Sequence, residues 1–226
     1  MSEQLIKKQA LSFLKKLAKN NNREWFTENK NEFISYQADI KVFFDAVMEN
    51  LNAHDYIEKL KMFRIYRDVR FSKDKTPYKT HFAGSFSRMG VERRGGYYLR
   101  IKPDESFIAT GFWGPDKEDL FRIRKELELD ATELKEILNN KDFKSTWGKL
   151  QGEAVKTAPK GFDKEHLDIN LIRHKQYIFK KNFTNEEVLS KNFLMQVSNS
   201  FKEIRPFFDL MSAILTTNLN GESLIS

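Results

Sequence analysis

The sequence contains no cysteine and no long apolar run. Without cysteine the chain has no disulfide framework, no thiol nucleophile and no thiolate metal ligand. No apolar stretch approaches the roughly 20 residues that cross a bilayer, and the first eight residues lack the apolar segment of a secretory signal peptide. These absences exclude a disulfide-stabilised secreted domain and a membrane-spanning protein. They indicate a soluble, cytoplasmic protein without a membrane partner.

The motifs of several common enzyme classes are missing as well. The chain has no GxGxxG, no GxxxxGK[ST] and no GxSxG, so dinucleotide-binding, P-loop and α/β-hydrolase functions have no support. Its four histidines, His54, His81, His166 and His174, form neither an HxH nor an HExxH pair. Without such a pair, even the His- and acid-rich segment 163–174 does not favour a metal site. We therefore expect no metal and no cofactor.

The composition, with 40% hydrophobic and 31% charged residues, is that of a folded globular chain. Apolar residues recur at helical spacing in residues 4–19, in residues 30–51 and in a C-terminal region that Pro206 is expected to split. Between 62 and 113 the apolar period changes to two, which predicts strands joined by short turns. The pattern predicts one α+β domain over residues 1–226. Its central antiparallel sheet of about five strands is packed by N-terminal and C-terminal helices, and the last residues, about eight, are frayed.

The individual elements follow from the same patterns. Strands are expected over 62–71, 82–86, 97–101, 106–110 and 176–180, with a hairpin turn at 103–105. Further along, Pro115 should open a helix that ends near 127, and a capping box at Thr184 and Glu187 should open the C-terminal helical region. Residues 88–96 are expected to form a mobile basic loop, and residues 141–162 a loop-rich segment.

The positive charge of the chain is confined to one region. Residues 61–102 contain twelve Lys or Arg and three Asp or Glu, a local balance of +9, whereas the whole chain carries +7. The rest of the chain is therefore slightly acidic. A regional excess of this kind favours a patch that attracts anions, although Lys and Arg are also common at hairpin edges.

The densest chemistry lies in residues 64–81. If 62–71 is a regular strand, Arg64, Asp68 and Arg70 share one face, where two guanidiniums beside a carboxylate can bind a phosphate or carboxylate group. Arg67 would then point to the apolar side, where it requires a buried carboxylate or carbonyl partner, unless a bulge re-aims the side chain. His81 lies within reach of this cluster as a candidate general base.

This pattern predicts a site that binds, and in an enzyme would act on, a small anionic or phosphorylated ligand. The arginines would hold the anion, Asp68 would orient them or act as a base, and Tyr78 would supply a proton. No residue is assigned as catalytic, because the pattern fits an enzyme and a pure binding protein alike. The expected ligand-binding residues are Arg64, Arg67, Asp68, Arg70, Ser72, Lys75, Tyr78 and Lys79, with Asn22, Arg23 and Trp25 from the N-terminal turn.

Two other interpretations stay open. A basic, aromatic-bearing sheet can stack bases and contact phosphates, which favours nucleic-acid binding through residues 61–102, with Arg88, Arg93, Arg94 and Arg100 as contacts. No RNA-recognition, KH or zinc-finger signature accompanies this patch. Alternatively, the Arg–Asp cluster is only a network that fixes a loop in a structural or interaction protein. The oligomeric state is not predicted.

Several stretches resemble a known family. NNREWF at 21–26 and RDVRFSKDKTPYKT at 67–80 look like signatures of domain-of-unknown-function family 2461. GYYL at 96–99, GxWxP at 111–115 and PKGFD at 159–163 match its later landmarks. The resemblance spans nearly the whole chain, except the segment 88–95. It implies a soluble single-domain protein whose characteristic residues coincide with the cluster at 64–81, and it implies no particular activity.

Overall fold

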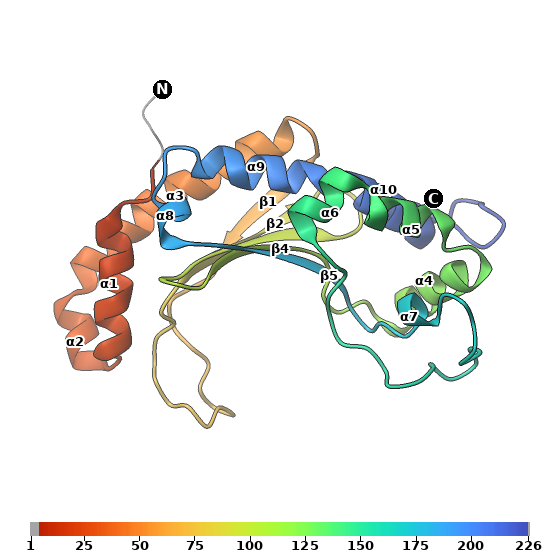
Figure 1. Cartoon of the computed structure of the whole chain (residues 1–226). Helices are drawn as coiled ribbons and strands as arrows, with labels where there is room; N and C mark the ends of the chain where they lie inside the picture. The colour runs from red at the N-terminus through yellow and green to blue at the C-terminus, as the bar shows by residue number, and fades with distance from the viewer. Residues whose placement is uncertain (1–4, 226) are drawn as a thin grey trace. The chain divides into compact units, whose positions relative to one another are not determined.

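The structure is a computed structural model that describes residues 5–225, and it contains a five-stranded antiparallel sheet (Figure 1). The strands are neighbours in space in the same order as in the sequence, so the sheet is a meander. The prediction of an α+β fold with such a sheet and with helices from both ends of the chain is confirmed. The strands are β1 (Ile57–Met62), β2 (Phe82–Arg88), β3 (Gly96–Ile101), β4 (Ser106–Phe112) and β5 (Tyr177–Phe183).

Helices precede, connect and follow the strands. Within residues 5–225 each helix is too short or too polar to pass through a bilayer. The helices are α1 (Lys8–Lys19), α2 (Arg23–Glu28), α3 (Lys30–Asn52), α4 (Lys117–Leu129), α5 (Thr132–Asn139), α6 (Lys141–Trp147), α7 (Ile169–Ile172), α8 (Asn185–Val188), α9 (Phe193–Glu203) and α10 (Arg205–Thr216).

The chain forms two compact units, and each is assembled from three stretches of sequence. Unit 1 contains the described residues up to Phe86, followed by Tyr98–Ile108 and Asn182–Asn199. Unit 2 contains Ser87–Tyr97, Ala109–Lys181 and the residues from Ser200 onward. The chain therefore crosses from one unit to the other several times. That these units behave as one domain stays a prediction.

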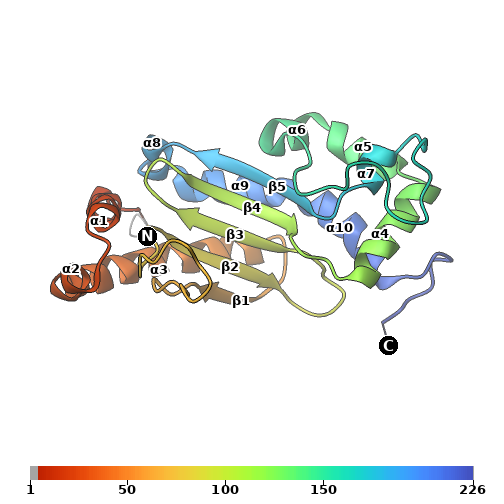
Figure 2. The ribbon, with the colours of Figure 1, turned by 90° about the horizontal axis from the view of Figure 1, so that it is seen from below.

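In unit 1, aromatic residues of α3 pack on β2. Phe33 stacks on Phe82 with ring centroids 5.8 Å apart, and Phe44 stacks on Phe86 at 6.0 Å. Gly84 lies between these two β2 residues and makes room for Phe44, because a Cβ there would lie 2.9 Å from the Phe44 ring. Seen from below in Figure 2, α3 lies behind β1 and β2. The predicted apolar stripe of the 30–51 helix is therefore the core of this unit.

The last stretch of unit 1 adds α8 and the start of α9. Thr184 and Glu187 form the predicted capping box, but it begins only the single turn of α8. Phe193 of α9 stacks on Phe43 of α3, with ring centroids 5.3 Å apart. Residues late in the chain thus complete a core that the N-terminal helices begin.

Unit 2 has its own aromatic core around α10. Phe207 meets Phe179 of β5 edge to face at 5.0 Å, and Phe208 meets Tyr97 of β3 at 5.1 Å. Pro206 lies in the first turn of α10, where a missing N–H removes no helical hydrogen bond. Because α9 ends at Glu203, the predicted split at the proline is confirmed.

Three predicted elements differ from the structure. The strand expected over 62–71 is wrong, since β1 ends at Met62 and Phe71, which was assigned to a buried face, is 96% exposed. The segment 141–162 contains α6, because the Asn140 side chain accepts hydrogen bonds from Asp142 N and Phe143 N and the side chain of Phe143 is buried. The helix expected from Pro115 begins later, at Lys117, because the Asp116 carboxylate caps it.

The residues after β1 form a hairpin extension, termed here the arm (residues 63–81). Its base is paired by hydrogen bonds from Phe63 N to Ala83 O (2.8 Å), Lys79 N to Ile65 O (2.7 Å) and Arg67 N to Pro77 O (2.9 Å). Beyond Arg67 and Pro77 the tip is irregular. Within unit 1, Figure 1 shows the arm leaving the sheet on the side opposite α3.

The C-terminal stretch contains a small turn, in which Thr217 pairs with Ser223. Fraying of the last residues stays a prediction, and Ser226 lies outside the described residues. Residues 1–4, which belong to the segment where no signal peptide is expected, also lie outside them.

Candidate functional site

The base of the arm is fastened to the turn between α1 and α2 by Asn21. Its amide nitrogen donates a hydrogen bond to Tyr78 O at 2.9 Å, and its amide oxygen accepts one from Tyr78 N at 3.1 Å. The Asn21 side chain thus replaces a neighbouring strand for this stretch of backbone. The Tyr78 ring is buried and stacks on Phe26 of α2, with ring centroids 4.0 Å apart. Burial raises the pKa of the Tyr78 phenol, so it stays protonated at neutral pH.

The tip of the arm is closed by a network around Arg67. The Arg67 guanidinium donates to the Asp74 carboxylate and to the Thr76 hydroxyl, and more weakly to Ser72 Oγ at 3.4 Å. The Thr76 N–H and the Arg67 guanidinium lower the pKa of Asp74 to about 2. Arg67 therefore has the carboxylate partner that was predicted, but the partner is not buried, since the Asp74 side chain is 59% exposed.

Between the end of α1 and the arm lies an open hollow of about 380 Å³, the arm-base hollow. Among the described residues that line it, the one acidic group is that of Asp74, whose charge Arg67 balances. Lys79 and His81 also line it, from the part of the arm that follows the tip and leads into β2. The full lining consists of Ala18, Asn21, Arg67, Asp74, Thr76, Tyr78, Lys79, Thr80 and His81.

The electrostatics of the hollow favour an anion. Burial, and then the nearby Arg64, lower the pKa of Lys79. Burial, and then Arg100, Lys79 and Lys102, lower the pKa of His81 to about 4, and Glu105 only partly opposes them. In residues 5–225 Lys79 forms no salt bridge with a carboxylate; its Nζ lies 5.6 Å from the centroid of the Phe63 ring. A partly desolvated ammonium group without a carboxylate partner is a natural contact for an anionic ligand.

The structure brings three of the predicted ligand-binding residues into this hollow, namely Arg67, Tyr78 and Lys79. At the arm tip, Arg70 pairs with Asp68 at 2.7 Å, Lys75 Nζ donates to Val69 O at 2.9 Å, and Ser72 accepts from Arg67.

The remaining predicted residues have other local contacts. Asn22 caps α2 by accepting a hydrogen bond from Trp25 N at 2.9 Å, and Trp25 packs on Phe13. Arg23 and Arg64 are exposed. A role in ligand binding for the residues outside the hollow stays a prediction.

The arginines expected to contact nucleic acid are mostly engaged within the protein. Arg88 is 6% exposed, and its guanidinium lies over the Phe208 ring and donates to Arg94 O. Arg94 pairs with Asp119, and Arg93 pairs with Glu92. The segment after β2 is therefore anchored in unit 2 at Arg88, and Arg88 cannot serve as a surface contact.

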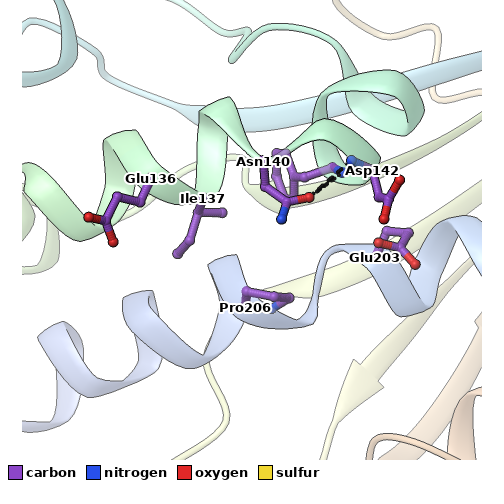
Figure 3. A pocket seen from close by; sticks show the side chains of 7 residues that line it. Glu136, Ile137, Asn140, Asp142, Glu203 and Pro206 are labelled. Atoms are coloured by element: carbon purple, nitrogen blue, oxygen red, sulfur yellow. Dashed lines mark hydrogen bonds between the residues drawn. The ribbon is translucent and has the colours of Figure 1, made fainter.

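A second cavity, of about 360 Å³, lies in unit 2 between α5, α6 and the α9–α10 junction (Figure 3). Glu136, Asp142 and Glu203 line it together with Asn140 and Pro206. Carboxylates favour a cation and oppose an anion, so this cavity does not match the ligand expected from the sequence. Within the described residues no group of His, Asp and Glu is arranged to hold a metal ion.

The sequence pattern missed the residues that close the hollow from the α1–α2 turn. Asn21 was recognised only as part of a motif, and its bond to Tyr78 joins positions 57 residues apart. Thr76 and Thr80 carried no signal beyond their place in the basic segment. His81 was expected to reach the cluster, and it does line the hollow.

Comparison with known proteins adds one positive result. A family model described as "Conserved hypothetical protein (DUF2461)" matches residues 9–210, a span that includes every residue lining the hollow. No curated protein and no solved structure gives a match. The matched span covers most of the 226 residues, as the resemblance of the motifs led us to expect. The chain therefore belongs to the conserved hypothetical protein family DUF2461.

Proposed function

We propose that the arm-base hollow binds a small anionic ligand that carries a phosphate group. The observation that carries this proposal is Lys79, a residue that lines the hollow and whose partly buried ammonium group has no carboxylate partner in residues 5–225. The Thr80 hydroxyl supplies a further donor on the same wall. An anion there would gain charge-assisted hydrogen bonds in a partly desolvated setting.

His81 gives the proposed site a dependence on pH. Because its pKa lies near 4, the imidazole is neutral at pH 7 when no anion is bound. A bound anion would oppose the positive field of Arg100, Lys79 and Lys102 and would raise this pKa. Binding should therefore take up a proton at acidic pH, where His81 begins to titrate, and a neutral His81 next to the ligand is the candidate proton acceptor if the protein is an enzyme.

The proposal is tested by isothermal titration of the protein with inorganic pyrophosphate at low salt. We expect Lys79→Gln to weaken binding by about 10- to 100-fold, because a hydrogen bond to a charged group contributes about 1.5–3 kcal/mol. Lys73→Gln is the matched control. It removes the same charge from the exposed arm tip, outside the hollow, and should leave the affinity within about twofold.

Three outcomes would contradict the proposal. Pyrophosphate that does not bind the wild-type protein removes the hollow as a phosphate site. Equal losses in Lys79→Gln and Lys73→Gln would mean that only net charge attracts the ligand. Loss of binding in Arg70→Ala, with Lys79→Gln unaffected, would move the site to the arm tip, where the sequence pattern first placed it.

A loop-fixing role for the arginine cluster is the second candidate, favoured by the Arg67 network at the arm tip. The two roles are compatible, since a fixed tip holds the walls of the hollow in place. A cytoplasmic location also stays a prediction.

A further inference from the structure

Three aromatic rings cross the face of unit 1 that points away from α3. Leu60 of β1 lies on the α3 side, beside Gly84, so Phe63 three residues later points to the opposite side. Phe63 contacts Tyr98 of β3 with ring centroids 6.1 Å apart, and Tyr98 contacts Phe107 of β4 at 5.6 Å. We term these three residues the aromatic row. All three are partly exposed, although none is needed to bury the α3 core.

Cations accompany both ends of the row. Lys61 Nζ lies 5.9 Å and Lys79 Nζ 5.6 Å from the centroid of the Phe63 ring. The Arg100 guanidinium lies 4.2 Å from the centroid of the Phe107 ring. In residues 5–225 neither Lys61 nor Lys79 forms a salt bridge, while Arg100 pairs with Glu105 at 3.2 Å. Positive charge and aromatic surface are thus combined on one face.

Single-stranded nucleic acid is the ligand class that uses both features. Its bases stack on aromatic rings whatever their sequence, and its phosphates contact cations spaced along the same path. Paired bases are stacked within a duplex and cannot reach such rings, so a duplex gains only the phosphate contacts. A small inorganic anion, by contrast, would use Lys79 and leave the aromatic row without a role.

We infer that the aromatic row binds single-stranded nucleic acid, with one to three bases stacked on Phe63, Tyr98 and Phe107. The backbone phosphates contact Lys61, Lys79 and Arg100. This inference rests on the proposed function, because Lys79 lines the arm-base hollow and also lies over Phe63. One phosphate of the strand would occupy the hollow, and the bases would extend from it across the sheet.

The test is a fluorescence anisotropy titration with a labelled thymidine 12-mer, a length within the roughly 4–16 nucleotides that an OB fold covers. Tyr98→Leu keeps apolar volume and removes the central ring, and it should weaken 12-mer binding by about 5- to 100-fold. Phe71→Leu is the matched control, since Phe71 is an exposed aromatic at the arm tip that is not part of the row.

A second variant keeps the test valid if Tyr98→Leu fails to fold. Lys61 is exposed, so Lys61→Gln should leave the fold intact. Three phosphate contacts predict a slope of log affinity against log salt of about −2, and Lys61→Gln should reduce its magnitude by about 0.7. An unchanged slope would overturn the assignment of Lys61.

The outcomes separate this inference from the proposed function. If pyrophosphate binds but the 12-mer does not, or if Tyr98→Leu and Phe71→Leu bind the 12-mer equally well, the nucleic-acid inference fails alone. If a 12-base-pair duplex binds as tightly as the single strand, or thymidine monophosphate as tightly as the 12-mer, the inference is also overturned. If the 12-mer binds with the expected loss in Tyr98→Leu while pyrophosphate does not bind, the proposed phosphate hollow fails and the aromatic row stands.

Discussion

Asn21 fastens the base of the arm to the turn between α1 and α2. Replacing it with alanine removes both of its hydrogen bonds to Tyr78 and leaves a backbone N–H and C=O without their partner. We expect Asn21→Ala to lower the free energy of unfolding by about 1–3 kcal/mol, measured by urea denaturation. Because the hollow depends on this link, pyrophosphate binding should weaken in the same variant.

Asn20→Ala is the control for this substitution. Asn20 is exposed, and in the described part of the chain its side chain donates to Lys16 O, within α1. If the two variants unfold at the same urea concentration, Asn21 is not the fastening point of the arm.

His81 should make the stability of the protein depend on pH. Its pKa of about 4 in the folded protein lies below the ordinary value near 6.5. Between these two values the unfolded chain binds a proton that the folded protein does not, so the free energy of unfolding falls as the pH is lowered. In His81→Gln, we expect a smaller fall in Tm between pH 7 and pH 5 than in the wild type.

The measurement is a series of thermal unfolding scans at fixed ionic strength. Burial of the imidazole and the nearby Arg100, Lys79 and Lys102 keep it neutral, and Glu105 opposes them. A Tm that falls equally steeply in both proteins would show that His81 titrates normally in the folded state.

At the scale of single elements, α6 shows how one polar side chain determines a helix. The Asn140 side-chain oxygen accepts hydrogen bonds from Asp142 N at 3.0 Å and Phe143 N at 3.1 Å, and Figure 3 shows the first of them. Asn140→Ala should cost about 1 kcal/mol of stability, since a helix loses its N-cap. Asn139→Ala, at an exposed site one residue earlier, should cost less in the same denaturation experiment. Equal losses would argue against the cap.

Elements with a clear period or a local cap were predictable from the sequence. The long helix α3 and the hairpin of β3 and β4 lie within one or two residues of their expected ranges, because their patterns are local and unbroken. The strand expected over 62–71 failed because apolar alternation continues after the chain has left the sheet. Sequence alternation cannot show that, within residues 5–225, Val69 and Phe71 have no neighbouring strand to pack against.

Only part of the candidate site was predictable from the sequence, because local patterns reveal its charged residues but not the distant contacts that form the hollow. The basic segment 64–81 was found from its composition, and Lys79 was among the residues named. The hollow itself depends on Asn21 and Tyr78, which lie far apart in sequence and meet through backbone hydrogen bonds. A contact of that kind leaves no period and no charge pattern in the sequence. The sequence also cannot show whether Lys79 has a carboxylate partner, because that depends on which carboxylates lie near it in the folded protein.

At the scale of the whole molecule, unit 1 is assembled from three separate stretches of chain, the last of which ends at Asn199. Phe193, in that last stretch, stacks on Phe43 in the first, with ring centroids 5.3 Å apart. During synthesis, the N-terminal helices and the arm therefore leave the ribosome long before the residues that complete their core. β2 can cover Phe33 and Phe44 of α3 early, but Phe43 lacks its stacking partner until most of the chain has been made, so unit 1 is completed only when α9 emerges.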